Sequence, residues 1–228
     1  MTTRYLRIRN GNNIVVIDSN YRNPSLRAKG TVATTAIVGS ASKASFNIPG
    51  VSATPVLAVA SSVGAYCHVS SFASGNALVE VFAHGPVGTS VAWYLFDDPG
   101  IVSPLKYFVI RNPDTNQVVF NANERYMRVA GVMPVNGLTG GSLTLPAGRT
   151  YAGYFAPPVG RSVTFTQTGV PQDDHWYITA IRRFLAISGG TITTNEADVG
   201  QSGPYVQLGS PARYQFDGNA FLLDVTGF

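Results

Sequence analysis

The sequence has little charge. Only 12% of its 228 residues are Asp, Glu, Lys or Arg, about half of the 25% that is usual in soluble domains. Hydrophobic residues make up 45%. A monomer in free solution usually carries more surface charge than this, whereas a subunit of an assembly hides part of its surface. The low charge therefore favours a protein that works inside an assembly.

Cysteine and long hydrophobic runs are also scarce. Cys67 is the single cysteine, which excludes an intramolecular disulfide, and we expect it to be a small buried residue on a strand rather than a nucleophile. No apolar run reaches the roughly 18 residues of a membrane span. No basic segment followed by an apolar one opens the sequence, so we expect no secretory signal peptide.

Helical periodicity is missing, and the residues that are abundant favour strands and turns. No long stretch places apolar residues at i, i+3, i+4 and i+7. There are 24 glycines and 14 prolines, and short alternating segments are separated by turn sequences such as SGN at 74–76, HGPVG at 84–88 and DGN at 217–219. Strands of this length and spacing are typical of β-sandwiches. The sequence therefore predicts an all-β protein.

One phrase of the sequence occurs twice. RYLRIRNGNNIVVIDSNYR at 4–22 aligns with KYFVIRNPDTNQVVFNANER at 106–125, and both have the composition of a β-hairpin. Two small gaps suffice, and the match continues to place Leu26 on Met127 and Gly30 on Gly131. The residues expected to have the same structural role in both copies are Ile8, Asn10 and Arg22 in the first and Ile110, Asn112 and Arg125 in the second.

The repeat divides the chain into two expected modules. A duplicated phrase about a hundred residues apart is typical of a duplicated domain, and the segment DDPGIVSP at 97–104 has the Pro and Gly content of a linker. The prediction is two tandem antiparallel β-sandwich (Ig-like) domains related by an internal repeat. The first is expected at 1–98 and the second at 104–228.

The positive charge is concentrated near the beginning of the sequence. The net charge is +4, and a basic group at 4–29 faces one acid, Asp18, within the first thirty residues. A nucleic-acid site needs interleaved aromatic residues or a known motif. This segment offers two tyrosines and no such motif, so an acidic protein neighbour is the favoured partner. Val109 replaces Arg7 in the second copy, so the first module is expected to anchor the protein and the second to be peripheral. The residues proposed to contact the partner are Arg4, Arg7, Arg9 and Lys29.

No constellation of catalytic residues is found in the sequence. His68 follows Cys67 on one predicted strand, so their side chains point to opposite faces and cannot form a nucleophile and base as neighbours. The run Asp173-Asp174-His175 could bind a metal, but acids in a loop with proline are more typical of a solvated turn. We expect no catalytic residue, no cofactor, no metal and no enzymatic activity; a depolymerase is a distant alternative.

Aromatic pairs allow a second hypothesis, which is binding of a glycan or receptor. Trp93-Tyr94 and Trp176-Tyr177 could offer stacking surfaces, although alternating positions in strands favour packing in the core. Arg182 lies on the same predicted strand as the second pair. The residues that form this candidate receptor site are Trp176, Tyr177 and Arg182.

The repeated phrase resembles a family of small structural proteins of tailed bacteriophages. The matching residues are 10–12, 14–19 and Arg22 in the first copy, and 112–114, 118–121 and Arg125 in the second. Ile17 and Asn121 depart from the aromatic residue and the aspartate that are usual in the family. The resemblance is to proteins encoded among tail-tip or minor tail genes.

The resemblance implies a virion subunit at the tail tip or baseplate, present in several copies around a symmetric tail and bound to other tail proteins. Such a protein is made in the cytoplasm of the bacterial host and resides in the virion. The alternative is a module on the tail that attaches to a host receptor or glycan. Copy number, symmetry, host and the surfaces in contact do not follow from the sequence.

Overall fold

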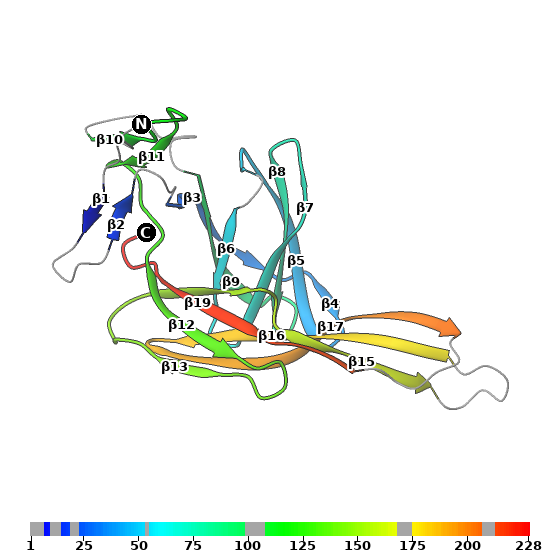
Figure 1. The fold of residues 1–228 in the computed structure, drawn as a ribbon. Coiled ribbons are helices and arrows are strands. Elements are labelled where there is room, and N and C mark those ends of the chain that lie inside the picture. Colours follow the sequence, from blue (N-terminus) through cyan, green and yellow to red (C-terminus); the bar gives the residue numbers. More distant parts are fainter. Residues whose placement is uncertain are drawn as a thin grey trace.

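The computed structural model describes residues 7–9, 15–18, 23–52, 55–98, 108–167, 175–206 and 213–228. In this part of the chain the fold is all-β, with nineteen strands and no helix (Figure 1). The described residues accordingly hold no helix that could cross a membrane. All strand pairs are antiparallel, which confirms the predicted fold class at this level.

One of the two large sheets has six strands. Its order is β12-β19-β14-β6-β9-β3. The bounds are β12 Val129–Val135, β19 Gly218–Asp224, β14 Tyr151–Ala156, β6 Val56–Ala60, β9 Ser90–Asp97 and β3 Ser25–Ala33.

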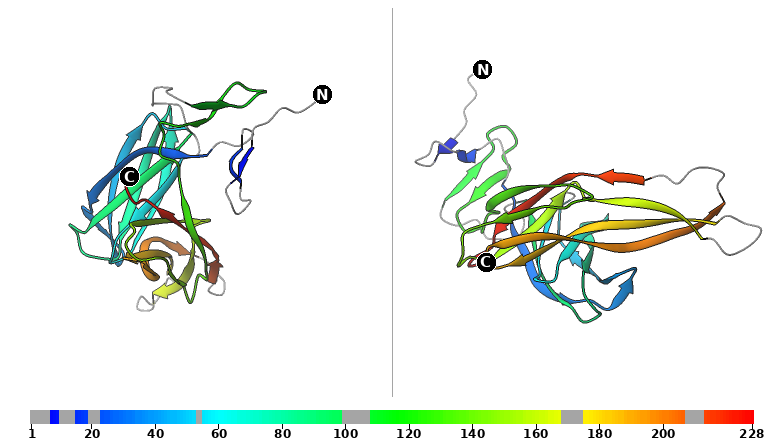
Figure 2. Two further views of the ribbon diagram at one scale, coloured as in Figure 1. Left: turned by 90° about the vertical axis from the view of Figure 1, so that its left-hand side faces the viewer. Right: turned by 90° about the horizontal axis from the view of Figure 1, so that it is seen from below.

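The other large sheet has nine strands, seven of which follow the order β13-β17-β16-β7-β8-β5-β4. The bounds are β13 Ser142–Thr144, β17 Thr191–Val206, β16 His175–Ser188, β7 Ala65–Ala73, β8 Asn76–Ala83, β5 Ala41–Pro49 and β4 Ala36–Val38. The remaining two are β15 Gly160–Gln167, which pairs with β16, and β18 Arg213–Phe216, which pairs with β15. The end of β15, the start of β16 and the end of β17 extend together beyond the body of the molecule, and we call this part the arm (Figures 1 and 2).

The two sheets pack face to face because their strands alternate between buried and exposed residues. In β8, Val79 and Val81 are fully buried against Leu57, Val59 and Leu95 of the six-stranded sheet. In the second half of the chain the matching core joins Leu185 and Ile192 of the nine-stranded sheet to Leu222 of β19. Each half therefore has its own interior between the same two sheets.

Both sheets continue from one half of the chain into the other. Gly153 of β14 pairs with Val59 of β6, and Leu185 of β16 pairs with Ala65 of β7. Two separate tandem Ig-like sandwiches are therefore not confirmed, since the strands before 98 and after 104 share both sheets. The reason is that strand edges, which two separate sandwiches would leave open, pair with each other here.

The strand order nevertheless repeats itself in the two halves. From the shared seam outward, the first half places β6, β9 and β3 in one sheet and β7, β8 and β5 in the other. The second half places β14, β19 and β12 in one sheet and β16, β17 and β13 in the other. Strands at equivalent places also follow one another in the same chain order. At each edge of the six-stranded sheet, the pairing of the last strand with its neighbour shifts register near the start of that strand. The shift lies between Leu26 and Ala28 in β3 and between Val129 and Gly131 in β12.

The two repeated phrases form two small hairpins outside the large sheets. They consist of β1 Arg7–Arg9 with β2 Val15–Asp18, and of β10 Val109–Arg111 with β11 Val118–Asn121. Ile8 pairs with Ile17 and Ile110 with Phe120, and in each hairpin the register shifts directly after that isoleucine. The registers thus agree with the sequence alignment of the hairpins, bulge included. Asn10 and Arg22 lie outside the described residues.

The two halves meet again directly after the hairpins. Ser25 and Tyr126 form an isolated antiparallel bridge, with Leu26 N donating to Arg125 O at 2.7 Å and Met127 N donating to Pro24 O at 2.8 Å. The sequence alignment equates Leu26 with Met127, so each residue meets its own counterpart.

Candidate functional site

Each half contributes three strands to the six-stranded sheet, and a buried aspartate stands at the end of the middle one. Asp97 ends β9 and is 2% exposed, and Asp224 ends β19 and is 5% exposed. Each follows two buried apolar residues of its strand, Leu95-Phe96 or Leu222-Leu223. A carboxylate placed there requires hydrogen-bond donors, because an unpaired buried charge is costly.

Asp97 is bonded by the main chain and by a serine. Ser52 N donates to Asp97 Oδ2 at 2.6 Å, the Ser52 hydroxyl donates to Oδ1, and Asp98 N donates to Oδ1 at 2.8 Å. Ser52 belongs to the connection between β5 and β6. The carboxylate thus fixes that connection to the end of β9, which is a structural role.

Asp224 is bonded instead by arginines. Arg149, in the connection between β13 and β14, donates from Nη1 to Asp224 Oδ2 at 2.5 Å. Thr226 N donates to Oδ1 at 2.9 Å, and Arg128 Nη2 lies 3.7 Å from Oδ1. Burial by itself raises the pKa of this carboxyl group, but the bonds from Thr226 and Arg149 and the charge of Arg128 outweigh it and bring the pKa to about 2. Asp224 is therefore ionised at neutral pH.

Two adjoining hollows share Arg149 and Tyr151, and we call them together the Arg149 groove. One has a volume of about 310 Å³ and the other of about 340 Å³. The first is lined by Arg128, Val129, Ala130, Pro146, Arg149, Tyr151 and Asp224. The second is lined by Ala60, Ser61, Ser62, Arg149, Thr150, Tyr151, Ile187 and Gly189.

The groove carries an excess of positive charge. Its two arginines are opposed by one carboxylate, Asp224. Arg128 is engaged, since it donates from Nη2 to Thr226 O at 2.6 Å and lies 4.5 Å from the ring centre of Phe228. The side chain of Arg149 is 57% exposed, and among the described residues the bond to Asp224 is the one that it donates. Because a guanidinium group has five N–H donors, Arg149 retains donors for an anion.

The arrangement is suited to binding rather than to acid–base chemistry. An exposed arginine with unpaired donors recognises a carboxylate or phosphate, often through two bonds at once. In the described ranges of the chain, no three side chains of His, Cys, Asp or Glu come together as they would around a metal ion.

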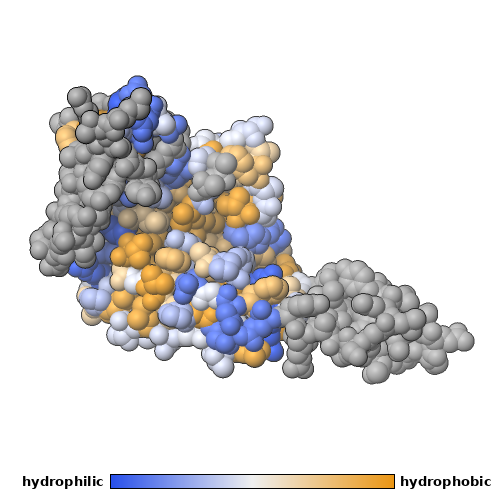
Figure 3. Space-filling view, viewed as in Figure 1, coloured by the Kyte–Doolittle hydropathy of each residue, from blue (hydrophilic) through white to orange (hydrophobic). Residues whose placement is uncertain are grey.

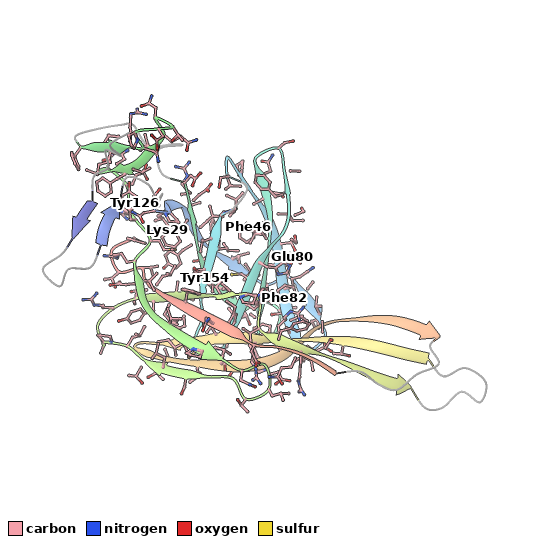
Figure 4. The ribbon with its side chains drawn as sticks, viewed as in Figure 1. Lys29, Phe46, Glu80, Phe82, Tyr126 and Tyr154 are labelled. Carbon is pink, nitrogen blue, oxygen red and sulfur yellow. The ribbon has the colours of Figure 1, made fainter. Side chains whose placement is uncertain are left out.

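The predicted basic patch near the beginning of the chain is described in part. Arg7 and Arg9 lie on β1, of which the backbone is described, and Arg4 lies outside the described residues. Lys29 lies exposed on β3, where Nζ donates to Phe228 O at 2.5 Å. Figure 4 shows Lys29 and Tyr126 on the side of the molecule that carries the hairpins. A common partner site of these residues stays a prediction.

The repeat residues of the second hairpin have structural contacts. Ile110 is buried with Val119. Asn112 Oδ1 accepts hydrogen bonds from Asp114 N at 2.9 Å and from Thr115 N at 3.0 Å, and so closes the turn. Arg125 contributes its carbonyl oxygen to the bridge with the first half.

Cys67 and His68 point to opposite faces of β7, as strand alternation predicts. The Cys67 thiol donates to Leu57 O at 3.4 Å within the interior, and burial raises its pKa. His68 stacks on Phe82 and places Nε2 at 3.3 Å from Glu80 Oε2, on the outer face. Burial lowers the pKa of His68, so the ring is neutral at pH 7.

The candidate receptor residues share β16 but are not assembled into a site in the described part of the chain. Trp176 and Tyr177 are described by their backbone, near the start of β16. Arg182, further along, lies close to Tyr66 on β7, whose pKa is raised by burial although the positive charge of Arg182 acts to lower it. Asp173 and Asp174 of the metal alternative lie outside the described residues.

Sequence reasoning missed the roles of Asp97, Asp224 and Arg149. A signal was present, because an aspartate directly follows an apolar strand near the end of each half, in YLFD at 94–97 and FLLD at 221–224. Arg149 carries no local signal, since it reaches Asp224 only through the fold.

Comparison with known proteins identifies no relative. No protein-family model, no curated protein and no solved structure matches the chain.

Proposed function

We propose that the protein is a structural subunit of a phage virion, at the tail tip or baseplate, that acts through contacts with neighbouring proteins. The resemblance of its repeated phrase to tail proteins supports this proposal. The structural observation that carries it is the pair of hairpins. Each hairpin is a separate two-stranded sheet, and such a hairpin has marginal stability in water unless it packs against something else.

The second hairpin illustrates the need for a partner. Its own cluster consists of Ile110, Val119 and Phe120, while Phe108 is 50% exposed. A neighbouring subunit that covers Phe108 would complete this small core. Hydrophobic residues also gather across the middle of the face shown in Figure 3, as expected for a surface that is partly covered in an assembly.

We further infer that the two halves are duplicated Ig-like modules that have merged their sheets. The repeated strand order, the matching bulges of the hairpins and the reciprocal Ser25–Tyr126 bridge support this inference. A protein with two similar halves presents two similar surfaces to its neighbours, which suits a subunit of a symmetric particle.

Incorporation into purified particles tests the proposed function. The wild-type protein is expected to co-purify with phage particles through a density gradient and to be visible on the tail by immuno-electron microscopy. Phe108→Asp should fold, because this side chain is half exposed, but should lower the occupancy several-fold. Absence of the wild-type protein from the particles would refute the proposal.

One observation favours the alternative of host attachment. Trp176 and Tyr177 lie in the part of β16 that pairs only with β15 and β17 and belongs to the arm, away from both cores (Figure 2). A projecting arm is a suitable place for receptor contacts. Particles with Trp176→Ala and Tyr177→Ala would then assemble normally but adsorb poorly to host cells.

A further inference from the structure

We propose that the Arg149 groove binds an extended, acidic peptide segment of a neighbouring protein. This inference rests on the proposed function, because it names the partner chemistry of one contact surface. It is drawn from three features of the structure: the charge of the groove, the apolar strand edge beside it and the difference between the two halves.

The charge of the groove selects an anion. Asp224 neutralises one of the two arginines, and Arg149 projects its remaining donors from a largely exposed side chain. A carboxylate brought to Arg149 would make charge-assisted hydrogen bonds, which are about twice as strong as neutral ones. The bond to Asp224 at 2.5 Å holds the guanidinium group in place beforehand, so little side-chain entropy is lost on binding.

The strand edge beside the groove selects an extended peptide. Arg128, Val129 and Ala130, at the start of β12, line the groove. In the described part of the chain β12 pairs with β19 along one edge only. Val129 is 51% and Val132 46% exposed. An open edge with apolar side chains is a template for an added strand, in which main-chain bonds give affinity and side chains give specificity.

The counterpart strand in the first half lacks these features. β3 forms the opposite edge of the same sheet, and its exposed residues include Lys29 and Thr31. The loop that meets its buried aspartate supplies Ser52 instead of an arginine. The arginines, the carboxylate and the apolar strand edge of the groove therefore come from the second half alone, while residues 60–62 of the first half complete its lining. A saccharide site is less suited to the groove, because its one aromatic residue, Tyr151, is buried and cannot stack on a sugar.

A pair of matched peptides tests the proposal. The probes are two fluorescein-labelled peptides of alternating valine and threonine, one with a central aspartate and the other with asparagine. Binding to the full-length protein is measured by fluorescence anisotropy at low salt. We expect the aspartate peptide to bind at least about tenfold more tightly, because one charge-assisted bond supplies that difference.

Variants place the site at the groove. Arg149→Gln should abolish the preference for the aspartate peptide. Val129→Asp should weaken binding of the aspartate peptide by about tenfold, because the like charges repel each other. Arg111→Gln removes the same charge from the exposed second hairpin, outside the groove, and should change nothing. Thermal unfolding of each variant checks that it is folded; Val129→Asp alters an exposed side chain and keeps the test available if Arg149→Gln unfolds.

Three results would overturn the inference. They are equal binding of the two peptides, no binding of either at millimolar concentration, and tighter binding of an oligogalacturonate probe at the same groove. None of them bears on incorporation into particles, so failure here can be told apart from failure of the proposed function. An Arg149→Gln protein that enters particles normally yet loses the peptide preference would support the site while assigning particle attachment to the hairpins.

Discussion

The two halves of the molecule hold the same buried carboxylate by different means. Asp97 is closed off by Ser52 and the main chain, whereas Asp224 is held by Arg149, Arg128 and Thr226. Serine and main-chain donors leave no charge at the surface, while the arginines do. The same place in the strand order can thus hold either a closed carboxylate or one that brings charged donors to the surface.

A pair of aligned glycines shows the same divergence. Gly30 lies under the indole ring of Trp93, and a methyl group added to it would come within 2.9 Å of a ring carbon. Gly131 lies under Leu143 and Leu145, at 3.1 and 3.2 Å from the same hypothetical methyl group. A rigid aromatic ring covers the first glycine and flexible aliphatic chains cover the second. The two positions are aligned in the sequence but differ in their tolerance of a side chain.

The largest expected difference between the halves concerns the aspartates. Asp97→Ala would leave the main-chain and hydroxyl donors of Ser52 without their acceptor and should lower the free energy of unfolding by about 3 kcal/mol. Asp224→Ala frees arginines that can turn to water and should cost about 1 kcal/mol. Urea unfolding at pH 7 measures both. Equal losses in the two variants would contradict the distinction between a closed and an open site.

The next largest difference between the halves is expected in the loss of stability when each aligned glycine is replaced by alanine. Gly30→Ala should cost about 2 kcal/mol, because Trp93 has to move against well-packed neighbours. Gly131→Ala should cost less than about 1 kcal/mol, since Leu143 and Leu145 can adjust. Thermal unfolding of both variants, with the near-ultraviolet signal of tryptophan as a probe, should show a perturbed indole in the first variant alone. An unchanged signal in Gly30→Ala would mean that Trp93 is not held against the glycine.

Low pH should destabilise the second half through protonation of Asp224. Its pKa is depressed from 3.8 to about 2 in the folded state, so the stabilisation is complete above pH 3.8 and is lost as the pH falls towards 2. The loss should amount to about 1 kcal/mol after allowance for solvent screening. Urea unfolding at pH 6 and pH 2.5 measures it. The Asp224→Asn protein should lack this part of the acid sensitivity, and full retention of it would assign the effect to other groups.

The smallest loss of stability is expected at Tyr126 of the second half, a position where the first half has a serine. Tyr126 stacks on Phe120 at 4.8 Å, and its hydroxyl group bonds Asn121 N at 2.5 Å and Asn121 O at 3.1 Å. The aligned position in the first half is Ser25. Tyr126→Phe should cost about 1 kcal/mol or less and mainly speed amide exchange in β11. Exchange that is unchanged in β11 would show that the hydroxyl group does not hold the hairpin.

The sequence predicted what depends on neighbours along the chain. The all-β class and the two hairpins follow from alternation, turn residues and the repeated phrase. The stretch TVATTAIVG at 31–39 has the composition of one strand, but β3 ends at Ala33 and β4 begins at Ala36. Strand boundaries of this kind depend on where the partner strand ends, which local sequence does not record.

Contacts between distant segments were out of reach of the sequence. The pairing of Gly153 with Val59 and of Leu185 with Ala65 joins segments that share no sequence signal for each other. Either edge could have stayed open under the same alternation pattern. Arg149 illustrates the same limit at the candidate site, because it is recognised only once the fold has placed it beside Asp224.

The seam between the halves also bears on how such a gene can change over generations. Recombination often exchanges whole domains between related genes, and it succeeds when a segment folds without its neighbour. Here a crossover between 98 and 104 would replace one side of two sheets at once, and the new segment would have to pair with β6 and with β7. The two halves should therefore be inherited as a pair, with variation confined to loops, hairpins and the arm.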